Sequence, residues 1–290
     1  MKTLREFVDY LQEDLPPKGI EFTKDTDERM YVGASSIGSD CERQIALRLR
    51  GFPQDVLTKK LRRIFSVGHK VEDVVVENIM SAIAANPEIV LEDTGPVQHE
   101  YTYFGKVCRA HSDGILYFVS DPTRKILVEI KTANDASFSA TVRQGIQVAH
   151  GEYYDQMQLM MGLGDMKEGL MYMINKNDSR LYTEIINFDH ATYYYLLQRI
   201  EFIAAGNDEK IARGPNDWRC SMCSYNVMCW TDEPVPVDRR HCRHCKNAIM
   251  TSDETLFATC CSPSVSVNGM TQADANRAKV CDYFEDHRGK

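Results

Sequence analysis

The sequence predicts a mixed α/β (α+β) fold in which helices flank a central mixed sheet, followed by a small C-terminal ribbon. Three observations support this prediction. Two apolar strands joined by a turn occupy residues 111–131. Helical patterns lie before and after these strands, and a cysteine-rich tail follows Pro234 and Pro236. A chain of 290 residues can bury one full core and still supply a small appendage.

The composition is typical of a soluble globular protein. Hydrophobic residues make up 43% of the chain and charged residues 26%, and no apolar run approaches the roughly 20 residues of a membrane helix. We therefore expect a cytoplasmic protein, in which ten cysteines favour metal binding over disulfides. The net charge of −8 neither predicts nor excludes a nucleic-acid partner, because a local basic groove can coexist with an acidic site.

Helices are expected in the first part of the chain. Residues 3–15 form an amphipathic pattern with charges throughout, unlike a signal sequence, and a Pro-Pro pair ends it. Ser39 or Asp40 can cap a helix that carries Cys41 in its first turn. A long helix is expected over residues 57–85, where apolar residues recur at helical spacing.

A sheet is expected from residue 97 to Lys131. A turn at residues 104–106 predicts a hairpin, so three or four antiparallel strands precede Glu129. A polar stretch then leads to a helix over residues 148–163. Two further strands and a final helix follow, over residues 170–175, 181–188 and 190–212.

Charged side chains share one face of the last strand in this sheet. Successive side chains of a strand alternate between faces, so Glu129 and Lys131 lie on one face and Val128 and Ile130 on the other. Asp113, at the head of the preceding strand, is near enough to join Glu129 around a hard cation. Unpartnered burial of such charges is costly, so chemistry or metal binding explains them best. The alternative is a structural Glu-Lys pair on an edge strand that faces water.

These residues resemble the core motif of the PD-(D/E)xK nucleases, an Asp followed, after a hairpin, by Asp or Glu-x-Lys. Asp113 and Glu129-Ile130-Lys131 match it, with Ser112 at the position of the motif's Pro. The resemblance implies a restriction-endonuclease-like core that hydrolyses DNA phosphodiester bonds with Mg2+ or Mn2+. It assigns Asp113, Glu129 and the backbone carbonyl of Ile130 to the metal, and it gives Lys131 the task of orienting or deprotonating the attacking water.

Two more positions resemble the RecB-type branch of this family, with departures. That branch carries a Gly and a His several residues apart on a helix before the sheet, whereas here Gly68 adjoins His69. His69 is the implied further metal ligand, and Glu72 is a competing candidate. The branch also has a Gln-x-x-x-Tyr motif, which Gln156 fits although Met160 stands in place of the Tyr. Gln156 would position the catalytic lysine or the scissile strand. We interpret the Met-rich side of that helix as core packing.

Three cysteines with C-x2-C-x5-C spacing follow the last predicted helix. This spacing brings thiolates within reach of one metal centre that still needs a fourth ligand, and spacing alone favours zinc. The pattern resembles RecB-type nucleases of the AddB and CRISPR-associated spacer-acquisition kind, which hold a 4Fe-4S cluster with one early and three late cysteines. The ligands that this implies are Cys41, Cys220, Cys223 and Cys229, with Cys108 as the competing early cysteine.

The C-terminal tail shows a second metal-binding pattern. A C-x2-C knuckle, an expected strand pair over residues 248–250 and 256–259, and later cysteines suggest a zinc ribbon, with ordinary free thiols as the alternative. The predicted Zn2+ ligands are Cys242, Cys245, Cys260 and Cys281, with Cys261 and His287 as alternates. The resulting domains are an N-terminal helix and loop (1–30), a nuclease domain with its cluster (31–232) and the ribbon (237–290).

Together the residues and the resemblance predict a Mg2+- or Mn2+-dependent deoxyribonuclease. The resemblance of the cysteine pattern to the RecB-type branch implies an exonuclease that acts on single strands or DNA ends in recombination, repair or replication. Two other classes stay open, a non-catalytic DNA-binding or scaffold protein and a structure- or sequence-specific endonuclease. The chain has no P-loop sequence, so a helicase or recombination partner would be a separate chain. Similar ribbons occur in phage nucleases, which implies the host cytoplasm for a phage-encoded chain.

Overall fold

The computed structural model describes residues 3–5, 30–55, 59–94, 98–235, 240–252, 258–260 and 281–288. Most of the helix expected over residues 3–15 lies outside this part of the chain, as do Cys261 and the side chain of His69. Among the described residues, no helix is long and apolar enough to cross a membrane.

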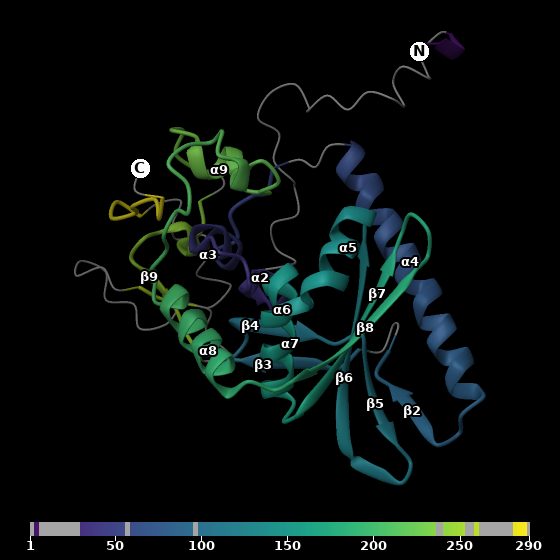
Figure 1. Cartoon of the computed structure of the whole chain (residues 1–290). Helices are drawn as coiled ribbons and strands as arrows, with labels where there is room; N and C mark the ends of the chain where they lie inside the picture. Colours follow the sequence, from purple (N-terminus) through teal and green to yellow (C-terminus); the bar gives the residue numbers. More distant parts are fainter. Residues whose placement is uncertain are drawn as a thin grey trace.

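A five-stranded mixed sheet forms the centre of the fold, with strand order β2-β5-β6-β7-β8 (Figure 1). β6 and β7 run parallel, and the other neighbouring strands are antiparallel. The predicted α/β class with a mixed sheet is therefore confirmed. The strands are β2 (Ile89–Glu92), β5 (Gly114–Phe118), β6 (Asp121–Ala133), β7 (Glu168–Asn175) and β8 (Leu181–Asn187).

Three short strands form a second sheet. β3 (Glu100–Tyr103) and β4 (Cys108–His111) make the hairpin predicted around residues 104–106, and β1 (Val32–Gly33) pairs with β4 in parallel. The expectation of one continuous sheet from residue 97 to Lys131 is therefore wrong. Turn residues fix the hairpin locally, but long-range packing decides which sheet it joins.

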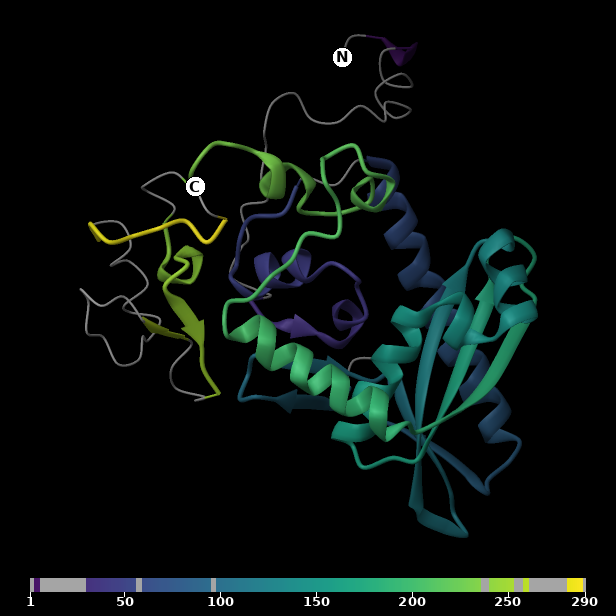
Figure 2. The ribbon, with the colours of Figure 1, turned by 60° about the vertical axis from the view of Figure 1, so that its left-hand side comes forward.

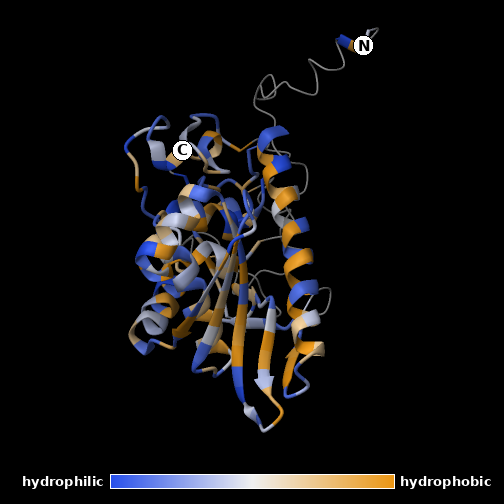
Figure 3. Cartoon of the chain, turned by 45° about the vertical axis from the view of Figure 1, so that its right-hand side comes forward, coloured by the Kyte–Doolittle hydropathy of each residue, from blue (hydrophilic) through white to orange (hydrophobic). Residues whose placement is uncertain are grey.

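Helices cover both faces of the central sheet (Figures 1 and 3). α4 (Lys59–Ala84) lies on one face, where Val75 forms a buried cluster with Val128 and Ile130. α7 (Gly151–Leu163) lies on the other face, where its buried Met157 packs in one core cluster with Leu127. α8 (His190–Ala204) packs against α7. Figure 3 shows hydrophobic and hydrophilic residues alternating along α4, as in an amphipathic helix.

Two helices differ from their predicted extents, and one helix was not predicted. The helix expected from residue 148 is divided at His150, with φ −147° and ψ 68°, into α6 (Ile146–Ala149) and α7. α5 (Asp135–Gln144) fills the expected polar stretch, because the Asn134 side chain accepts a hydrogen bond from the Ser137 N–H and caps the helix. α8 ends at Ala204 instead of residue 212, shortly before Gly206, whose φ is +100°.

The described C-terminal residues pack against the main domain (Figure 2). β9 (Ala248–Met250) and β10 (Ala258–Cys260) pair antiparallel, as expected for the strand pair. Ala248 and Met250 belong to the same buried cluster as the core residues of α7 and α8. The segment therefore shares its apolar core with the main domain.

A buried arginine joins the two parts. Arg50, at the end of α3 (Glu42–Leu49), is 1% exposed. It donates hydrogen bonds to the carbonyl oxygens of Arg243, Cys245 and Ala248 at 3.0, 2.9 and 2.8 Å. Burial lowers the pKa of Arg50 to about 10. These three contacts tie the cysteine-rich segment to α3.

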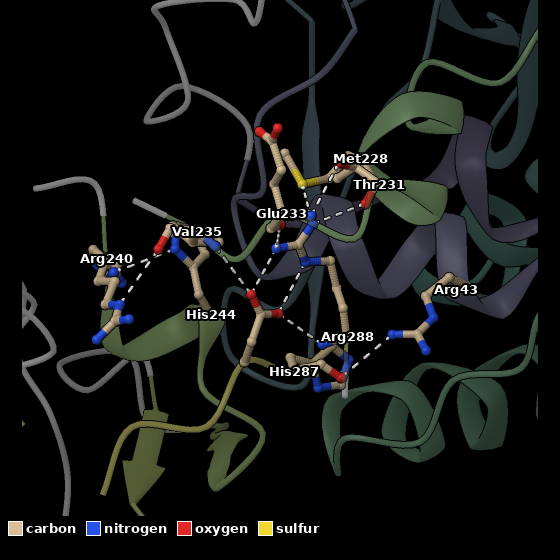
Figure 4. Close-up of polar contacts among 11 residues, drawn as sticks. Arg43, Met228, Thr231, Glu233, Val235, Arg240, His244, His287 and Arg288 are labelled. Atoms are coloured by element: carbon tan, nitrogen blue, oxygen red, sulfur yellow. Dashed lines mark hydrogen bonds and ion pairs between the residues drawn. The ribbon is translucent and has the colours of Figure 1, made fainter. Parts of the chain in front are cut away.

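The last described residues are anchored in a similar way (Figure 4). Arg288 donates to the carbonyl oxygens of Met228 and Glu233, each at 3.0 Å, and forms a 2.7 Å ion pair with Asp286. The bond to Met228 is buried and the bond to Glu233 is partly buried, so the guanidinium satisfies carbonyl groups that have little access to water.

Candidate active site

Strand β6 carries the predicted acidic and basic pair into the interior. Glu129 is 1% exposed, and the ammonium group of Lys131 contacts its Oε1. Val128 and Ile130 face α4 on the opposite side, as strand alternation requires. The alternative of a water-facing pair on an edge strand is wrong, because β6 is the middle strand of the sheet and the carboxylate is buried.

Asp113 stands immediately before β5, beside Glu129. Its Oδ2 accepts a 2.7 Å hydrogen bond from the backbone N–H of Ile130. The N–H and C=O of one strand residue point to the same side, so the Ile130 carbonyl faces the Asp113 side of β6 as well. Pairing of β5 with β6 begins at Gly114 opposite Val128, and β6 continues past this point to the site.

Gln156 reaches Glu129 from α7. Its Nε2 donates a 2.6 Å hydrogen bond to Oε1, the oxygen that Lys131 also contacts. The other oxygen of Glu129, Oε2, is buried and has no hydrogen-bond partner within the described part of the chain. A buried carboxylate oxygen without a partner is costly, and a hard cation is a group that satisfies it. Asp113, Glu129 and the Ile130 carbonyl thus fit a divalent cation.

The site holds more carboxylate than ammonium charge. Burial raises the pKa of Glu129 to about 8, although the charge of Lys131 opposes this shift. Burial also raises the pKa of Asp113. Burial alone would lower the pKa of Lys131, but the charges of Glu129 and Asp113 raise it overall. The cluster therefore favours the uptake of positive charge, either as protons or as a cation.

Helix α4 approaches the site from the other side. The charge of Glu72 is among the causes that raise the pKa of Glu129. One turn earlier, a methyl group at Gly68 would lie 3.8 Å from Thr132 Oγ1, so this part of α4 lies against β6 near the site. His69 belongs to the same turn, but its side chain is outside the described part of the chain. Of the two candidate ligands on α4, Glu72 is thus the one with a described electrostatic effect on Glu129.

Tyr153 is a site residue that the sequence motif did not indicate. Lys131 Nζ lies 5.3 Å from the centroid of its ring. Tyr153 precedes Gln156 by three residues, and positions i and i+3 share one face of a helix, which is a signal that could have found it. Met160, which stands where the related motif has Tyr, is fully buried with its neighbouring methionines. The core-packing interpretation of this Met-rich side is confirmed.

The four cysteines that the resemblance assigns to a cluster line one small pocket. They come from the N-cap of α3, from η1 (Trp218–Cys220), from the turn that follows it and from α9 (Asn226–Trp230). α3 begins one residue after Cys41, so this cysteine precedes the first turn instead of lying in it. Burial raises the pKa of Cys223 to about 11 and also raises that of Cys229. The competing Cys108 is fully buried in the main core on β4.

The predicted zinc ligands of the C-terminal segment lie on neighbouring elements. Cys242 begins η3 (Cys242–His244), and Cys245 forms a β-bridge with Asp286. Cys260 pairs with Ala248 across β9 and β10, and Cys281 is a free thiol. The alternate His287 lies against the main domain, with its Nε2 3.2 Å from Asp208 Oδ2.

Among the described residues, neither set of cysteines forms a closed ligand shell. Within the described ranges, no group of three or more His, Cys, Asp or Glu side chains stands close enough to hold a metal ion.

No protein-family model and no curated protein matches this sequence. Solved structures to which this chain is similar include an alkaline exonuclease (LHK-Exo) from Laribacter hongkongensis, 16% identical, with TM-score 0.45 over 61% of this chain and 87% of that one. Another is SSO0001, 17% identical, with TM-score 0.42 over 80% of this chain and 98% of that one. A phage-related exonuclease from Haemophilus somnus 129PT is 17% identical, with TM-score 0.38 over 60% and 91%. The identities and TM-scores are low, so these likenesses establish no activity for this chain.

Proposed function

We propose that the protein is a Mg2+- or Mn2+-dependent DNA exonuclease that hydrolyses phosphodiester bonds. The observation that carries this proposal is the buried Glu129 carboxylate, in which Lys131 and Gln156 contact Oε1 while Oε2 has no partner among the described residues. A carboxylate pair beside a lysine suits phosphoryl transfer, because a cation and an ammonium group together offset the charge that develops on the phosphate.

The side chains divide into ligands and reacting groups. Asp113, Glu129 and the Ile130 carbonyl would hold the cation, with Glu72 or His69 as a further ligand from α4. A cation bound there would polarise the substrate phosphate and lower the pKa of a bound water.

Lys131 and Gln156 would act around that water. Lys131, whose pKa the neighbouring carboxylates raise, would orient that water as an ammonium group and offer positive charge to a phosphate oxygen. Gln156 keeps the Glu129 carboxylate in one orientation through its 2.6 Å hydrogen bond. Tyr153 limits the positions open to the Lys131 ammonium, since its ring lies 5.3 Å away.

A basic surface near the site favours a nucleic-acid substrate over a small phosphate ester. The first five residues of α4 are Lys-Lys-Leu-Arg-Arg, and Lys60 and Arg62 are exposed. The same helix reaches β6 at Gly68. Such a surface attracts a phosphate backbone without reading its sequence.

The choice of an exonuclease rests on the resemblance of the cysteine pattern to the RecB-type branch. A structure- or sequence-specific endonuclease would use the same core. A non-catalytic DNA-binding or scaffold protein would have no use for Asp113, Glu129 and Lys131 together. The proposed substrate is single-stranded DNA or a DNA end in recombination, repair or replication, with any helicase or recombination partner in a separate chain. A phage-encoded protein would do this work in the host cytoplasm.

Two further metal centres complete the proposal. A 4Fe-4S cluster would join the early and late parts of the nuclease domain, and the shared pocket of its four thiols supports this assignment. Zn2+ would hold the C-terminal module, where pairing of Cys260 with Ala248 brings it close to the turn of Cys245. The ligands would be Cys41, Cys220, Cys223 and Cys229 for the cluster, and Cys242, Cys245, Cys260 and Cys281 for zinc, with Cys261 and His287 as alternates.

The test is Mg2+- or Mn2+-dependent digestion of labelled linear and circular single-stranded DNA by anaerobically purified protein. Degradation of linear DNA only, lost in Lys131→Ala and in chelator, supports the exonuclease. Cleavage of the circle indicates an endonuclease. DNA binding without cleavage in either metal indicates a binding or scaffold protein.

A further inference from the structure

A second polar array lies beside the active site. Ser137 Oγ is 3.0 Å from His150 Nε2, and His150 Nδ1 is 3.3 Å from Glu152 Oε1. The His150 ring stacks on Tyr153, with centroids 4.8 Å apart and an interplanar angle of 21°. Tyr153 is also the ring that lies 5.3 Å from Lys131 Nζ. A single aromatic side chain therefore connects the array to the catalytic lysine.

We propose that Ser137 and His150 bind a phosphodiester group of the substrate strand next to the one that is cleaved. The inference rests on the proposed nuclease function and adds a substrate contact to it. The Tyr153 ring lies 5.3 Å from Lys131 Nζ and 4.8 Å from the His150 ring. A phosphate that neighbours the scissile one along the strand is therefore within reach of His150.

The hydrogen bonds decide which atoms can face an anion. With Glu152 accepting from Nδ1, the Nε2 of a neutral ring accepts the Ser137 hydroxyl proton, so this hydroxyl cannot donate elsewhere. A ring protonated on both nitrogens donates from Nε2 to Ser137 Oγ and frees the hydroxyl proton for a phosphate oxygen. The pair then offers a charge-assisted donor to the strand.

The side chains of this array are not needed to cap α5 or α7. His150 is the N-cap residue of α7, but its side chain does not cap that helix. Ser137 lies in the first turn of α5, where Asn134 supplies the cap. The His150 side chain is 15% exposed and that of Glu152 is 47% exposed, so a strand in the active site can approach them. Ser137 and His150 are thus available for a ligand.

The test uses the full chain and single-stranded oligonucleotides with one neutral methylphosphonate linkage at successive positions. In the parent protein, a methylphosphonate beside the scissile linkage should slow cleavage about tenfold, the effect of one lost charge-assisted hydrogen bond. His150→Gln and Ser137→Ala should each lower kcat/KM about tenfold on the unmodified strand, mainly through KM. In these variants the same modification should have little further effect, because the contact is already gone.

The control variant is His190→Gln, which changes an exposed histidine at the first residue of α8 and should keep the parent's sensitivity. Equal sensitivity of the parent and His150→Gln to the modified strands would overturn the inference while leaving the nuclease function intact. If the parent cuts no strand, the nuclease function fails instead. Inorganic phosphate is then titrated into protein with labelled histidine rings. A shift of the His150 signals, identified by their loss in His150→Gln, supports the phosphate site, and unmoved signals overturn it.

Discussion

Gln156 Nε2 donates a 2.6 Å hydrogen bond to Glu129 Oε1, across 27 residues of sequence. Lys131 contacts the same oxygen, so helix α7 and strand β6 together fix the orientation of one buried carboxylate. The remaining oxygen, Oε2, has no partner among the described residues and is the one left for a cation. Gln156 thus acts on the proposed metal through Glu129, and its removal should change metal affinity.

Replacement of Gln156 by Met keeps a similar side-chain volume but removes the donor. The Glu129 carboxylate then loses one of its two contacts on Oε1, and its orientation is no longer fixed from α7. We expect the Mg2+ concentration for half-maximal cleavage to rise by about 10- to 100-fold. Cleavage rates measured over a Mg2+ series check this. Gln144→Met, at the exposed end of α5, is the control, and an unchanged Mg2+ requirement in Gln156→Met would contradict the role.

Glu129 should make the metal-free protein less stable at high pH. Its pKa is raised to about 8 in the folded state, above its ordinary value near 4.5, because burial disfavours the charged form. Such a group gives its full stabilisation below the unfolded pKa and loses it as pH rises through the folded pKa. In chelator, we expect Tm to fall by about 3 °C or more between roughly pH 5 and pH 9.

Glu129→Gln removes this titration. The variant should show a flatter Tm profile in chelator and no cleavage, because the amide is neutral at every pH and is a poor ligand for a hard cation. Added Mg2+ should raise the Tm of the parent most at high pH and leave the variant unchanged. Thermal unfolding of both proteins across the pH series measures this. Parallel profiles would place the pH dependence in other groups.

The parts of the site that the sequence predicted are those set by local geometry. Strand alternation places Glu129 and Lys131 on one face of β6. The turn that joins β5 to β6 brings Asp113, at the head of β5, beside them. Tyr153 was missed because its position over Lys131 depends on how α7 packs against the sheet. The same limit applies to the β3–β4 hairpin, which was predicted from its turn but assigned to the wrong sheet.

The packing of the C-terminal segment against the main domain also could not be predicted from the sequence. The strand pair expected over residues 248–250 and 256–259 is present as β9 and β10. Nothing in the local pattern separates Arg50 from the nearby Arg43 and Arg48, since all three lie in or beside one short helix. Only the tertiary fold turns Arg50 inward to three carbonyl groups.

Cys41→Ser should abolish the proposed iron-sulfur cluster. The four cysteines line one pocket, and a hydroxyl is a poor substitute for a thiolate ligand to iron. We expect anaerobically purified parent protein to be brown and the variant to lose most of its iron and visible absorption. Cys108→Ser, in the main core, should keep both. Full iron content in Cys41→Ser would exclude this cysteine as a ligand, and a colourless parent that contains zinc at this site would exclude the cluster.

Arg50→Met should destabilise the protein strongly. The variant removes the Arg50 donor from the buried carbonyl oxygens of Arg243, Cys245 and Ala248, and the Cys245 oxygen keeps the Ala248 N–H at 3.1 Å. The loss of three hydrogen bonds to buried acceptors should lower the free energy of unfolding by about 3 kcal/mol or more. Urea unfolding measures the loss. Arg124→Met is the matched control, because Arg124 is 53% exposed and its ion pair with Glu168 is screened by water, so the change should be small.

Arg50→Met also tests how the C-terminal segment is joined to the nuclease domain. Ala248 and Met250 lie in the main core cluster, so loss of the Arg50 contacts should weaken the whole domain in a single transition. Retained stability, equal to that of Arg124→Met, would show that the guanidinium contributes little. A separate early transition, with cleavage of DNA preserved, would show instead that the cysteine-rich segment unfolds by itself and that the active site on β6 does not depend on it.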